Sequence, residues 1–340
     1  MIKPEILFLK QEDAIQAGLL DMKEIMNVTE NMYKLLGENK VIQPNKVFLG
    51  MPDSINWTSF AMSMPAYISG ENEVVGFKWA AESVYNATQK GMPYGIDVVL
   101  LSDPKTMYPK AIMDGTIITA MRTSAVAGIC AKYCARKDSK IAALIGAGVI
   151  GRTMVMAICE AFPGIEEIRM VDLDRNKAEG LVNEFKGKHP VTAYTDAKSA
   201  IDGADIIVTQ TTAREGFIPK AWITKNNATA IQMEAHAFNH DVWLGDGIKI
   251  CDSWEQYMHI EGSVILELNR AGKLKKEDFI EIKDLATGKF AGRENDDQFV
   301  FCATYGMGTL DVAVANMLYM NAKAKGIGQK LVLWDNPLWI

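Results

Sequence analysis

The amino-acid sequence predicts an α/β protein that combines a Rossmann dinucleotide-binding domain with a discontinuous α+β domain. Three observations carry this prediction. The chain has 340 residues, which is enough for two domains with cores of their own. An apolar run, 141–145, leads directly into a glycine series, and a helical pattern then precedes a second strand-like segment, 168–171, that ends on Asp172. Strand-like and helical patterns alternate after residue 141 but do not alternate before it.

The glycine series has the spacing G-x-G-x-x-G. In a dinucleotide site the first glycine permits a tight turn, the second lets the backbone approach the pyrophosphate, and the third lets helix and strand pack closely. Asp172 ends the next strand, where a carboxylate accepts hydrogen bonds from the ribose and repels a 2′-phosphate. We therefore expect NAD as the cofactor, and the nearby Arg175 leaves NADP as the alternative. The loop residues expected to contact the cofactor are Gly146, Gly148, Val149, Ile150 and Gly151.

The segment before the glycine series reads as α+β. We expect a first strand at 6–10, an amphipathic helix at 21–36 and a long helix at 114–135, with four strand-like pieces between the two helices. Those pieces are 47–49, 59–64, 74–79 and 96–101.

The segment after the glycine series continues as βαβ. Its later strands are expected at 192–194, 206–210, 229–233 and 249–251. A final helix at 310–325 is expected to return to the first domain, so the predicted domains are 1–130 with 310–340, and 131–309. The last ten residues carry Trp334 and Trp339, and an apolar tail of this kind docks on its own chain or on a partner subunit.

Composition excludes several classes of function. The 36 basic and 42 acidic residues give a net charge of −6 with no basic block, so nucleic acid and anionic membranes are poor partners. No stretch of about 18 apolar residues is available to span a bilayer. The five cysteines are an odd number scattered through apolar contexts, as is typical of reduced thiols in a cytosol. We expect a soluble, cytoplasmic protein.

Three charged residues stand in apolar surroundings. Lys78 lies inside a predicted strand, as part of a substrate site or of a solvated strand face. Arg122 lies on a helix of small residues, where its guanidinium group suits a substrate carboxylate, a cofactor phosphate or an internal salt bridge. Glu234 follows the strand at 229–233, so it could act as a base at the ligand edge of the sheet or cap the next helix.

His236 and His240 are four residues apart, with Asp241 beside them. Metal binding is conceivable, but no third His or Cys stands at ligand spacing. We expect no metal, and interpret the pair as surface polarity or as a hydrogen bond near the substrate.

These residues make the sequence similar to the ornithine cyclodeaminase/mu-crystallin family over nearly its whole length. The segments that carry the resemblance are 76–78, 121–125, 146–151 with Asp172, the strand leading to Glu234, and 305–311. Segments 61–65, 102–104, 291–297 and 326–328 look most like the branch that contains N-(2-amino-2-carboxyethyl)-glutamate dehydrogenase.

The resemblance implies roles for individual residues. Lys46 and Lys78 match positions that hold a substrate carboxylate, and Arg122 and Thr123 match positions close to cofactor and substrate. Glu234 stands where the family has a catalytic aspartate, in a run, 233–239, that departs from the family's pattern. Near the nicotinamide and substrate the resemblance places Thr304 and Tyr305, and Thr211 is expected as a further cofactor contact. It also implies a homodimer formed through the domain of 1–130 and 310–340.

The resemblance implies catalysis at a carbon–nitrogen bond. We expect an NAD-dependent oxidoreductase that converts an L-amino acid or N-substituted amino acid through an imine, as a dehydrogenase or an imine reductase. One alternative is a cyclodeaminase-type lyase, which converts L-ornithine to L-proline and ammonia and recycles NAD. Another is a mu-crystallin-like, NADP-dependent ketimine reductase or binding protein for small molecules.

Overall fold

The computed structural model describes residues 5–51, 59–88 and 91–339 of the chain. It divides into two compact units: unit 1 is Met1–Arg122 with Met307–Ile340, and unit 2 is Thr123–Gly306. The division falls inside the long helix α4 (Thr116–Cys134), eight residues before the boundary that we expected, and again just ahead of the last helix. The assignment of substrate and cofactor roles to the two units remains a prediction.

Unit 1 is built on an eight-stranded sheet of order β16-β1-β7-β6-β5-β4-β2, with β3 also paired to β4. Its pairs are antiparallel except β1 with β7. The strands are β1 (Glu5–Leu9), β2 (Val41–Ile42), β3 (Val47–Gly50), β4 (Ser59–Ile68), β5 (Val74–Ser83), β6 (Gly95–Ser102), β7 (Pro109–Asp114) and β16 (Gln329–Val332).

Helix α12 (Gly308–Lys325) covers one face of this sheet, where it packs on β4, β5, β6 and the helix α2 (Met22–Gly37). The final helix therefore belongs to unit 1. Helix α2 begins where the sequence indicates, because the Asp21 side chain caps it by accepting a hydrogen bond from Glu24 N at 3.1 Å. The remaining helices of unit 1 are α1 (Gln11–Gln16) and α3 (Val84–Thr88).

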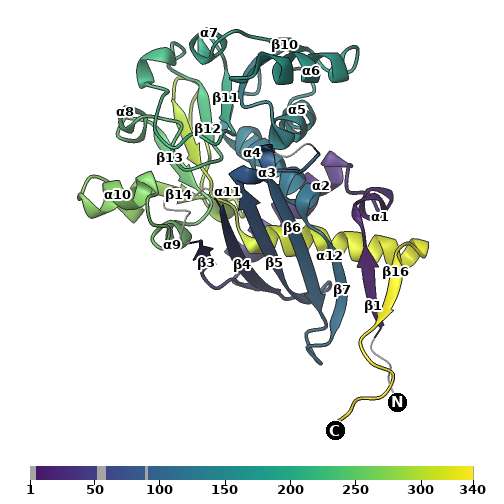
Figure 1. Cartoon of the computed structure of the whole chain (residues 1–340). Helices are drawn as coiled ribbons and strands as arrows, with labels where there is room; N and C mark the ends of the chain where they lie inside the picture. The colour runs from purple at the N-terminus through teal and green to yellow at the C-terminus, as the bar shows by residue number, and fades with distance from the viewer. Residues whose placement is uncertain (1–4, 52–58, 89–90, 340) are drawn as a thin grey trace. The chain divides into compact units, whose positions relative to one another are not determined.

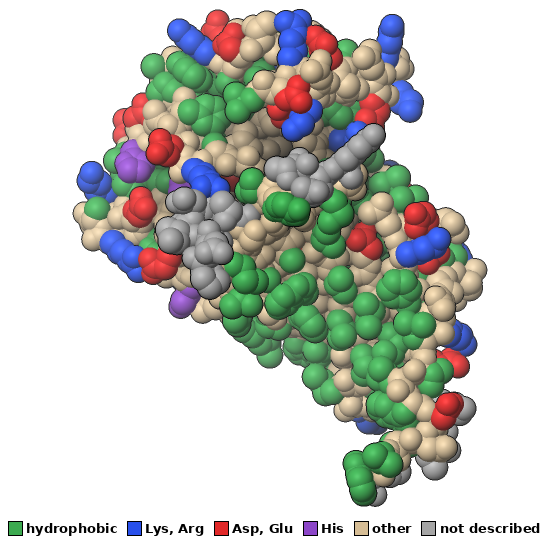
Figure 2. All heavy atoms as spheres, viewed as in Figure 1, with side chains coloured by type: hydrophobic (Ala, Val, Ile, Leu, Met, Phe, Trp, Pro, Cys, Tyr) green, Lys and Arg blue, Asp and Glu red, His purple; other side chains and the backbone are tan. Residues whose placement is uncertain are grey.

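The other face of the unit 1 sheet is open and apolar. Side chains alternate along the strands, so Lys78 points to the α12 face while Trp79 and its cross-strand neighbour Val98 point outward. Trp79 is 41% exposed and Val98 is 39% exposed. Figure 2 shows hydrophobic side chains gathered over the strands of this face.

Unit 2 has a second eight-stranded sheet, parallel throughout, of order β10-β9-β8-β11-β12-β15-β13-β14. Its strands are β8 (Ile141–Ile145), β9 (Glu167–Val171), β10 (Val191–Ala193), β11 (Ile206–Thr209), β12 (Thr229–Gln232), β13 (Ile248–Cys251), β14 (Phe279–Glu281) and β15 (Val300–Ala303). The chain proceeds from β8 outward to β10 and then returns to β11 on the other side of β8. This reversal is the point at which Rossmann sheets bind dinucleotides, and the predicted fold class is confirmed.

Short helices connect the strands of unit 2. They are α5 (Val149–Ala161), α6 (Arg175–Phe185), α7 (Ala197–Ile201), α8 (His240–Trp243), α9 (Trp254–Tyr257), α10 (Val264–Arg270) and α11 (Ile282–Ala286), with single turns at Lys220–Trp222 and Lys276–Asp278. Within the described parts of the chain, no helix combines the length and the apolar character needed to cross a membrane.

Candidate active site

The three glycines after β8 differ in what surrounds them. Gly146 has φ +116°, and a Cβ there would lie 2.5 Å from the Gln210 carbonyl oxygen. A Cβ on Gly151 would lie 2.2 Å from the Gly146 carbonyl oxygen, so helix α5 can approach the turn only because this position is glycine. A Cβ on Gly148 would meet nothing within 4 Å. The second glycine therefore faces open space, in which a pyrophosphate can approach the backbone.

Asp172 closes this loop from the end of β9. Its Oδ2 accepts a hydrogen bond from Ala147 N at 2.7 Å, and its Oδ1 accepts one from Asp174 N at 2.9 Å. The carboxylate thus lies beside the glycine turn and at the start of α5, whose N-cap residue is Gly148. Loop, helix start and acid together fit a dinucleotide. Arg175, which leaves NADP as the alternative, is exposed and bonds Glu179 at 2.7 Å.

Gln210 and Thr211 follow β11, the next strand along the sheet from the glycine turn. The Gln210 amide donates to the Gly146 carbonyl at 2.9 Å and so supports the turn from the neighbouring strand. The Thr211 hydroxyl accepts from Ala213 N at 3.2 Å. Sequence reasoning missed Gln210, whose link to the glycine loop joins segments distant in the sequence.

Glu234 follows β12 with its carboxylate buried inside unit 2. Neither carboxylate oxygen has a hydrogen-bond partner among the described residues. Burial raises the pKa of Glu234 to about 7. The Thr209 hydroxyl and the backbone amides of Thr211 and Met233 lie close enough to oppose this rise in part. A carboxylate that titrates near neutral pH can both accept and donate a proton, as a general base and acid require.

The chain around Glu234 is folded back on itself. The Gln232 amide group donates to the Glu234 carbonyl at 2.9 Å, and its oxygen accepts from Phe238 N at 3.0 Å. Phe217 N and Ile218 N both donate to the Ala237 carbonyl. The 233–239 run is therefore an ordered loop in which Glu234 is held at the carboxyl edge of the sheet, and it does not cap a helix.

Tyr305 and Thr304 follow β15, the neighbour of β12. The Thr304 hydroxyl donates to Met233 Sδ at 3.2 Å. The buried Asp252, which follows β13, accepts hydrogen bonds at 2.8 Å from both Tyr305 N and Gly306 N. The ring of Tyr257 lies 6.0 Å from that of Tyr305. Asp252 and Tyr257 were not predicted from the sequence, because each contacts Tyr305, which lies in a much later segment of the chain.

In unit 1, Lys78 and Arg122 converge on one buried aspartate. Lys78 Nζ lies 3.1 Å from Asp311 Oδ1 and 3.6 Å from Asp97 Oδ2, and it donates to the Thr119 hydroxyl at 3.2 Å. Arg122 Nε bonds the same Asp311 oxygen at 3.0 Å. Lys78 is only 2% exposed, so the interpretation as a solvated strand face was wrong.

Asp311 is held ionised by these two cations. It is fully buried on α12, and burial would raise its pKa, but Arg122 and Lys78 outweigh that effect and lower the pKa. Arg122 therefore forms the internal salt bridge that we weighed. Among the described residues, however, its two terminal guanidinium nitrogens make no hydrogen bond and can still take a planar anion.

Two further predictions concern unit 1 and its boundary. Lys46 is half-buried just before β3, and Thr123 is buried on α4 next to Arg122.

Glu82 shares the α12-facing side of β5 with Lys78. Burial and then the Asp97 carboxylate raise the pKa of Glu82, against the opposing effects of Lys78 and Arg122. Sequence reasoning missed Asp97, Glu82 and the role of Asp311 as a partner.

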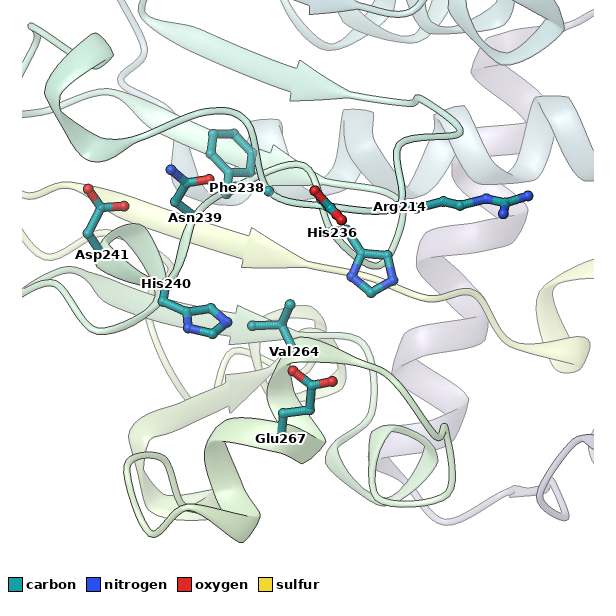
Figure 3. Close-up of a pocket in the computed structure, with 10 residues that line it drawn as sticks. Arg214, His236, Phe238, Asn239, His240, Asp241, Val264 and Glu267 are labelled. Atoms are coloured by element: carbon teal, nitrogen blue, oxygen red, sulfur yellow. The ribbon is translucent and has the colours of Figure 1, made fainter. Parts of the chain in front are cut away.

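His236 and His240 line a cavity of about 580 Å³ in unit 2. In Figure 3 both imidazole rings point toward Val264 and Glu267 of α10, whereas Arg214 extends away from them. Burial lowers the pKa of His236, and Glu267 opposes this. No group of three or more His, Cys, Asp or Glu side chains in the described ranges is arranged to hold a metal ion.

A sequence model of the ornithine cyclodeaminase/mu-crystallin family matches residues 8–326. The chain belongs to this family. Among its relatives is the N-((2S)-2-amino-2-carboxyethyl)-L-glutamate dehydrogenase of Staphylococcus aureus, which is 29% identical over 335 residues, covering 97% of this chain and 99% of the relative.

Two solved structures resemble this family member closely. A Δ¹-pyrroline-2-carboxylate reductase of Thermococcus litoralis, in complex with NADH and L-proline, superposes with a TM-score of 0.88 at 29% identity, over 96% of this chain and all of that one. An archaeal alanine dehydrogenase dimer with bound NAD superposes with a TM-score of 0.86 at 28% identity, over 97% of this chain and all of that one.

Proposed function

We propose that this protein is an NAD-dependent oxidoreductase that acts on the carbon–nitrogen bond of an L-amino acid or N-substituted amino acid through an imine. The observation that carries the proposal is Glu234, a buried carboxylate without a hydrogen-bond partner among the described residues, in the same sheet edge as a complete dinucleotide loop. The family's dehydrogenases and imine reductases described above support it.

The glycine turn and the start of α5 hold the pyrophosphate, and Asp172 holds the adenosine ribose. When bound, NAD accepts a hydride from the substrate carbon or returns it. The negative charge of Asp172 disfavours the 2′-phosphate of NADP. Thr211 and Thr304, which follow the two strands that flank β12 in unit 2, are the further residues that we assign to cofactor contact.

Lys78, Arg122 and Lys46 supply positive charge for the substrate carboxylate. Arg122 has for this purpose the two guanidinium nitrogens that bond none of the described residues, while Asp311 fixes its orientation through Nε. Lys78 is bonded to Asp311, Asp97 and Thr119, so it acts mainly by fixing that cluster and by its charge. Holding a substrate in one orientation accounts for a large part of the rate of such reactions.

Glu234 moves the protons. Ionised, it accepts a proton from the substrate amine or from water, and with its pKa near 7 it returns that proton to the leaving nitrogen without a large energetic penalty. Tyr305 closes this part of the site, held by Asp252 through its backbone amide, and we assign it to substrate contact.

The open apolar face of the unit 1 sheet supports a homodimer. Trp79, Val98 and Ile96 would be buried there by a second copy, and one of the structures that this chain resembles is a dimer. We propose that the second copy covers this face, and that the protein works in the cytoplasm on small amino or imino acids.

The test is to incubate the purified protein with NAD⁺ and a panel of L-amino acids and N-carboxyalkyl amino acids, and to follow NADH, ammonia and product mass together. Formation of NADH and keto acid in equal amounts supports the proposal and names the substrate class. A cyclic imino acid with ammonia and no net NADH would contradict it in favour of a cyclodeaminase. Tight binding of cofactor and small acids with no turnover of any substrate would favour a binding protein.

A further inference from the structure

Buried polar atoms without a hydrogen-bond partner are concentrated at the carboxyl edge of the unit 2 sheet. Among the described residues they are the Thr209 hydroxyl, the Gln210 amide oxygen, both carboxylate oxygens of Glu234 and the Tyr257 hydroxyl. Native proteins satisfy nearly all such atoms, with protein groups, ligands or water. Several such atoms at one edge indicate a place at which a substrate, a cofactor or water supplies the missing hydrogen-bond partners.

Tyr257 is the member of this group that has no role so far. It is 2% exposed at the end of α9, directly after β13, and its ring packs 6.0 Å from Tyr305. The start of α9 is fixed because Glu281 accepts from Trp254 N at 2.8 Å. Tyr257 and Glu234 follow β13 and β12, the two strands that flank β15, so both lie at the same edge of the sheet.

We infer that Tyr257 is a positioning residue that holds, through its hydroxyl, the water molecule from which Glu234 takes a proton. The inference rests on the proposed function, in which an imine must be hydrated before an open-chain product leaves. A water molecule bonded to both groups would satisfy the Tyr257 hydroxyl and a Glu234 oxygen at once.

The step balances without any change of oxidation state. The water oxygen bonds to the carbon of the protonated imine, the second electron pair of the C=N bond moves onto nitrogen, and Glu234 takes one proton from the water. Glu234 then returns that proton to the nitrogen. The carbon–nitrogen bond breaks with its electron pair leaving on nitrogen, the C=O bond forms as the hydroxyl proton passes to the Glu234 carboxylate, and a keto acid and an amine result. Burial raises the pKa of Tyr257 well above its usual range, so it stays protonated and directs the water by hydrogen bonding alone.

The test compares two rates for one open-chain substrate in the Tyr257→Phe variant: the first-turnover formation of NADH, and the formation of keto acid. Phenylalanine keeps the ring packing and removes only the hydroxyl. We expect keto-acid formation to fall by about tenfold or more, as is typical of lost general-base assistance, while first-turnover NADH changes less than about twofold. Equal losses in both rates, or no loss in either, would overturn the inference.

Stability provides the control for folding. Removing a buried hydroxyl that has no partner leaves stability unchanged or increases it, so the variant's Tm should not fall. Thr29→Val is the matched variant: it removes another buried hydroxyl, from α2 in unit 1, that has no partner within the described ranges, and it should leave both rates unchanged. A fall in Tm with parallel loss of both rates in Tyr257→Phe would show a structural role instead. If the wild-type protein forms no NADH from any substrate, the proposed function itself fails, which is a separate result.

Discussion

Glu234 and Asp311 are both buried carboxylates, and their surroundings shift their pKa values in opposite directions. Asp311 has two cations within hydrogen-bonding distance of one oxygen, and these lower its pKa against the effect of burial. Glu234 has no cation and no hydrogen-bond partner among the described residues, so burial dominates and raises its pKa to about 7. The first environment suits a structural anchor, and the second suits a group that exchanges protons.

The raised pKa of Glu234 makes a prediction about stability. The folded state binds this proton more tightly than the unfolded state, so the contribution to stability is complete below about pH 4.5 and is lost as pH rises through about 7. Glu234→Gln cannot ionise. Its advantage over wild type in free energy of unfolding should therefore grow between these pH values, to about 3 kcal/mol at pH 8.

Denaturant titrations of both proteins at pH 5 and pH 8 measure this difference. The same variant should lose about a hundredfold or more in kcat, together with the limb of the pH profile near 7. An advantage that is the same at both pH values would contradict the assigned pKa.

Arg122 gives a second prediction at this scale. Arg122→Lys keeps a charge for Asp311 but lacks the planar pair of donors, so KM for the amino acid should rise by about tenfold while Tm changes little.

Lys78→Ala should cut kcat/KM by orders of magnitude. It also leaves Asp97 and Asp311 short of a cation, so the free energy of unfolding should fall by about 3 kcal/mol or more. Substrate titrations and thermal melts of both variants check this. A normal KM in Arg122→Lys would contradict its carboxylate role.

Sequence reasoning found Lys78, Arg122 and Glu234 because each is a charge in apolar surroundings. It could not find what they touch. Asp311 lies 189 residues after Arg122, and Asp97 reaches the cluster only through the register of β5 with β6. No pattern in the neighbouring sequence points to Asp252 or Tyr257 either. The roles assigned to the site residues stay predictions until these variants are measured.

At the scale of elements, the loop from β8 to α5 shows how three glycines divide their tasks. Two are required by the fold: Gly146 has a left-handed φ, and Gly151 lies against the Gly146 carbonyl. The remaining glycine, Gly148, has room around it. Fold and function therefore place separate demands on one short segment, and substitutions can separate them.

Alanine substitutions test this division. Gly148→Ala should leave Tm nearly unchanged and weaken NAD binding by about tenfold or more, because the added methyl group would project where the pyrophosphate must approach. Gly151→Ala should lower Tm, because a Cβ 2.2 Å from a carbonyl oxygen forces the helix to move. Calorimetric NAD titrations and thermal melts would show the contrast. Equal effects on folding at both positions would argue against it.

The long periodic segments and most of the short strands were predicted, but several strands were not. The helices expected at 21–36, 114–135 and 310–325 correspond to α2, α4 and α12. Strands β7, β14 and β15 were missed because their few apolar residues also fit a loop or the end of a helix. The tail was expected to dock on its own chain or a partner. Part of it forms β16, which pairs with β1, while Trp334 and Trp339 stay exposed.

At the scale of the whole molecule, the open sheet face of unit 1 predicts the oligomeric state. Val98→Asp places a charge at the middle of that face, on β6, and should convert a dimer to a monomer in light scattering at micromolar concentration. Lys110→Asp, a charge change on the adjacent strand β7, is a control for altered surface charge and should leave the dimer intact. A wild-type protein that is monomeric would contradict the proposed interface.

The family resemblance and the NAD-type fold are confirmed, and the central claim is that the protein catalyses a net oxidoreduction. The most direct measurement uses an L-amino acid substrate deuterated at Cα, with NAD⁺, and follows the label by mass spectrometry. Net oxidoreduction predicts deuterium in the reduced cofactor, in an amount equal to the keto acid that forms. Return of the deuterium to an amino or imino acid product, with the cofactor left oxidised, would contradict this account and show redox-neutral cyclodeamination.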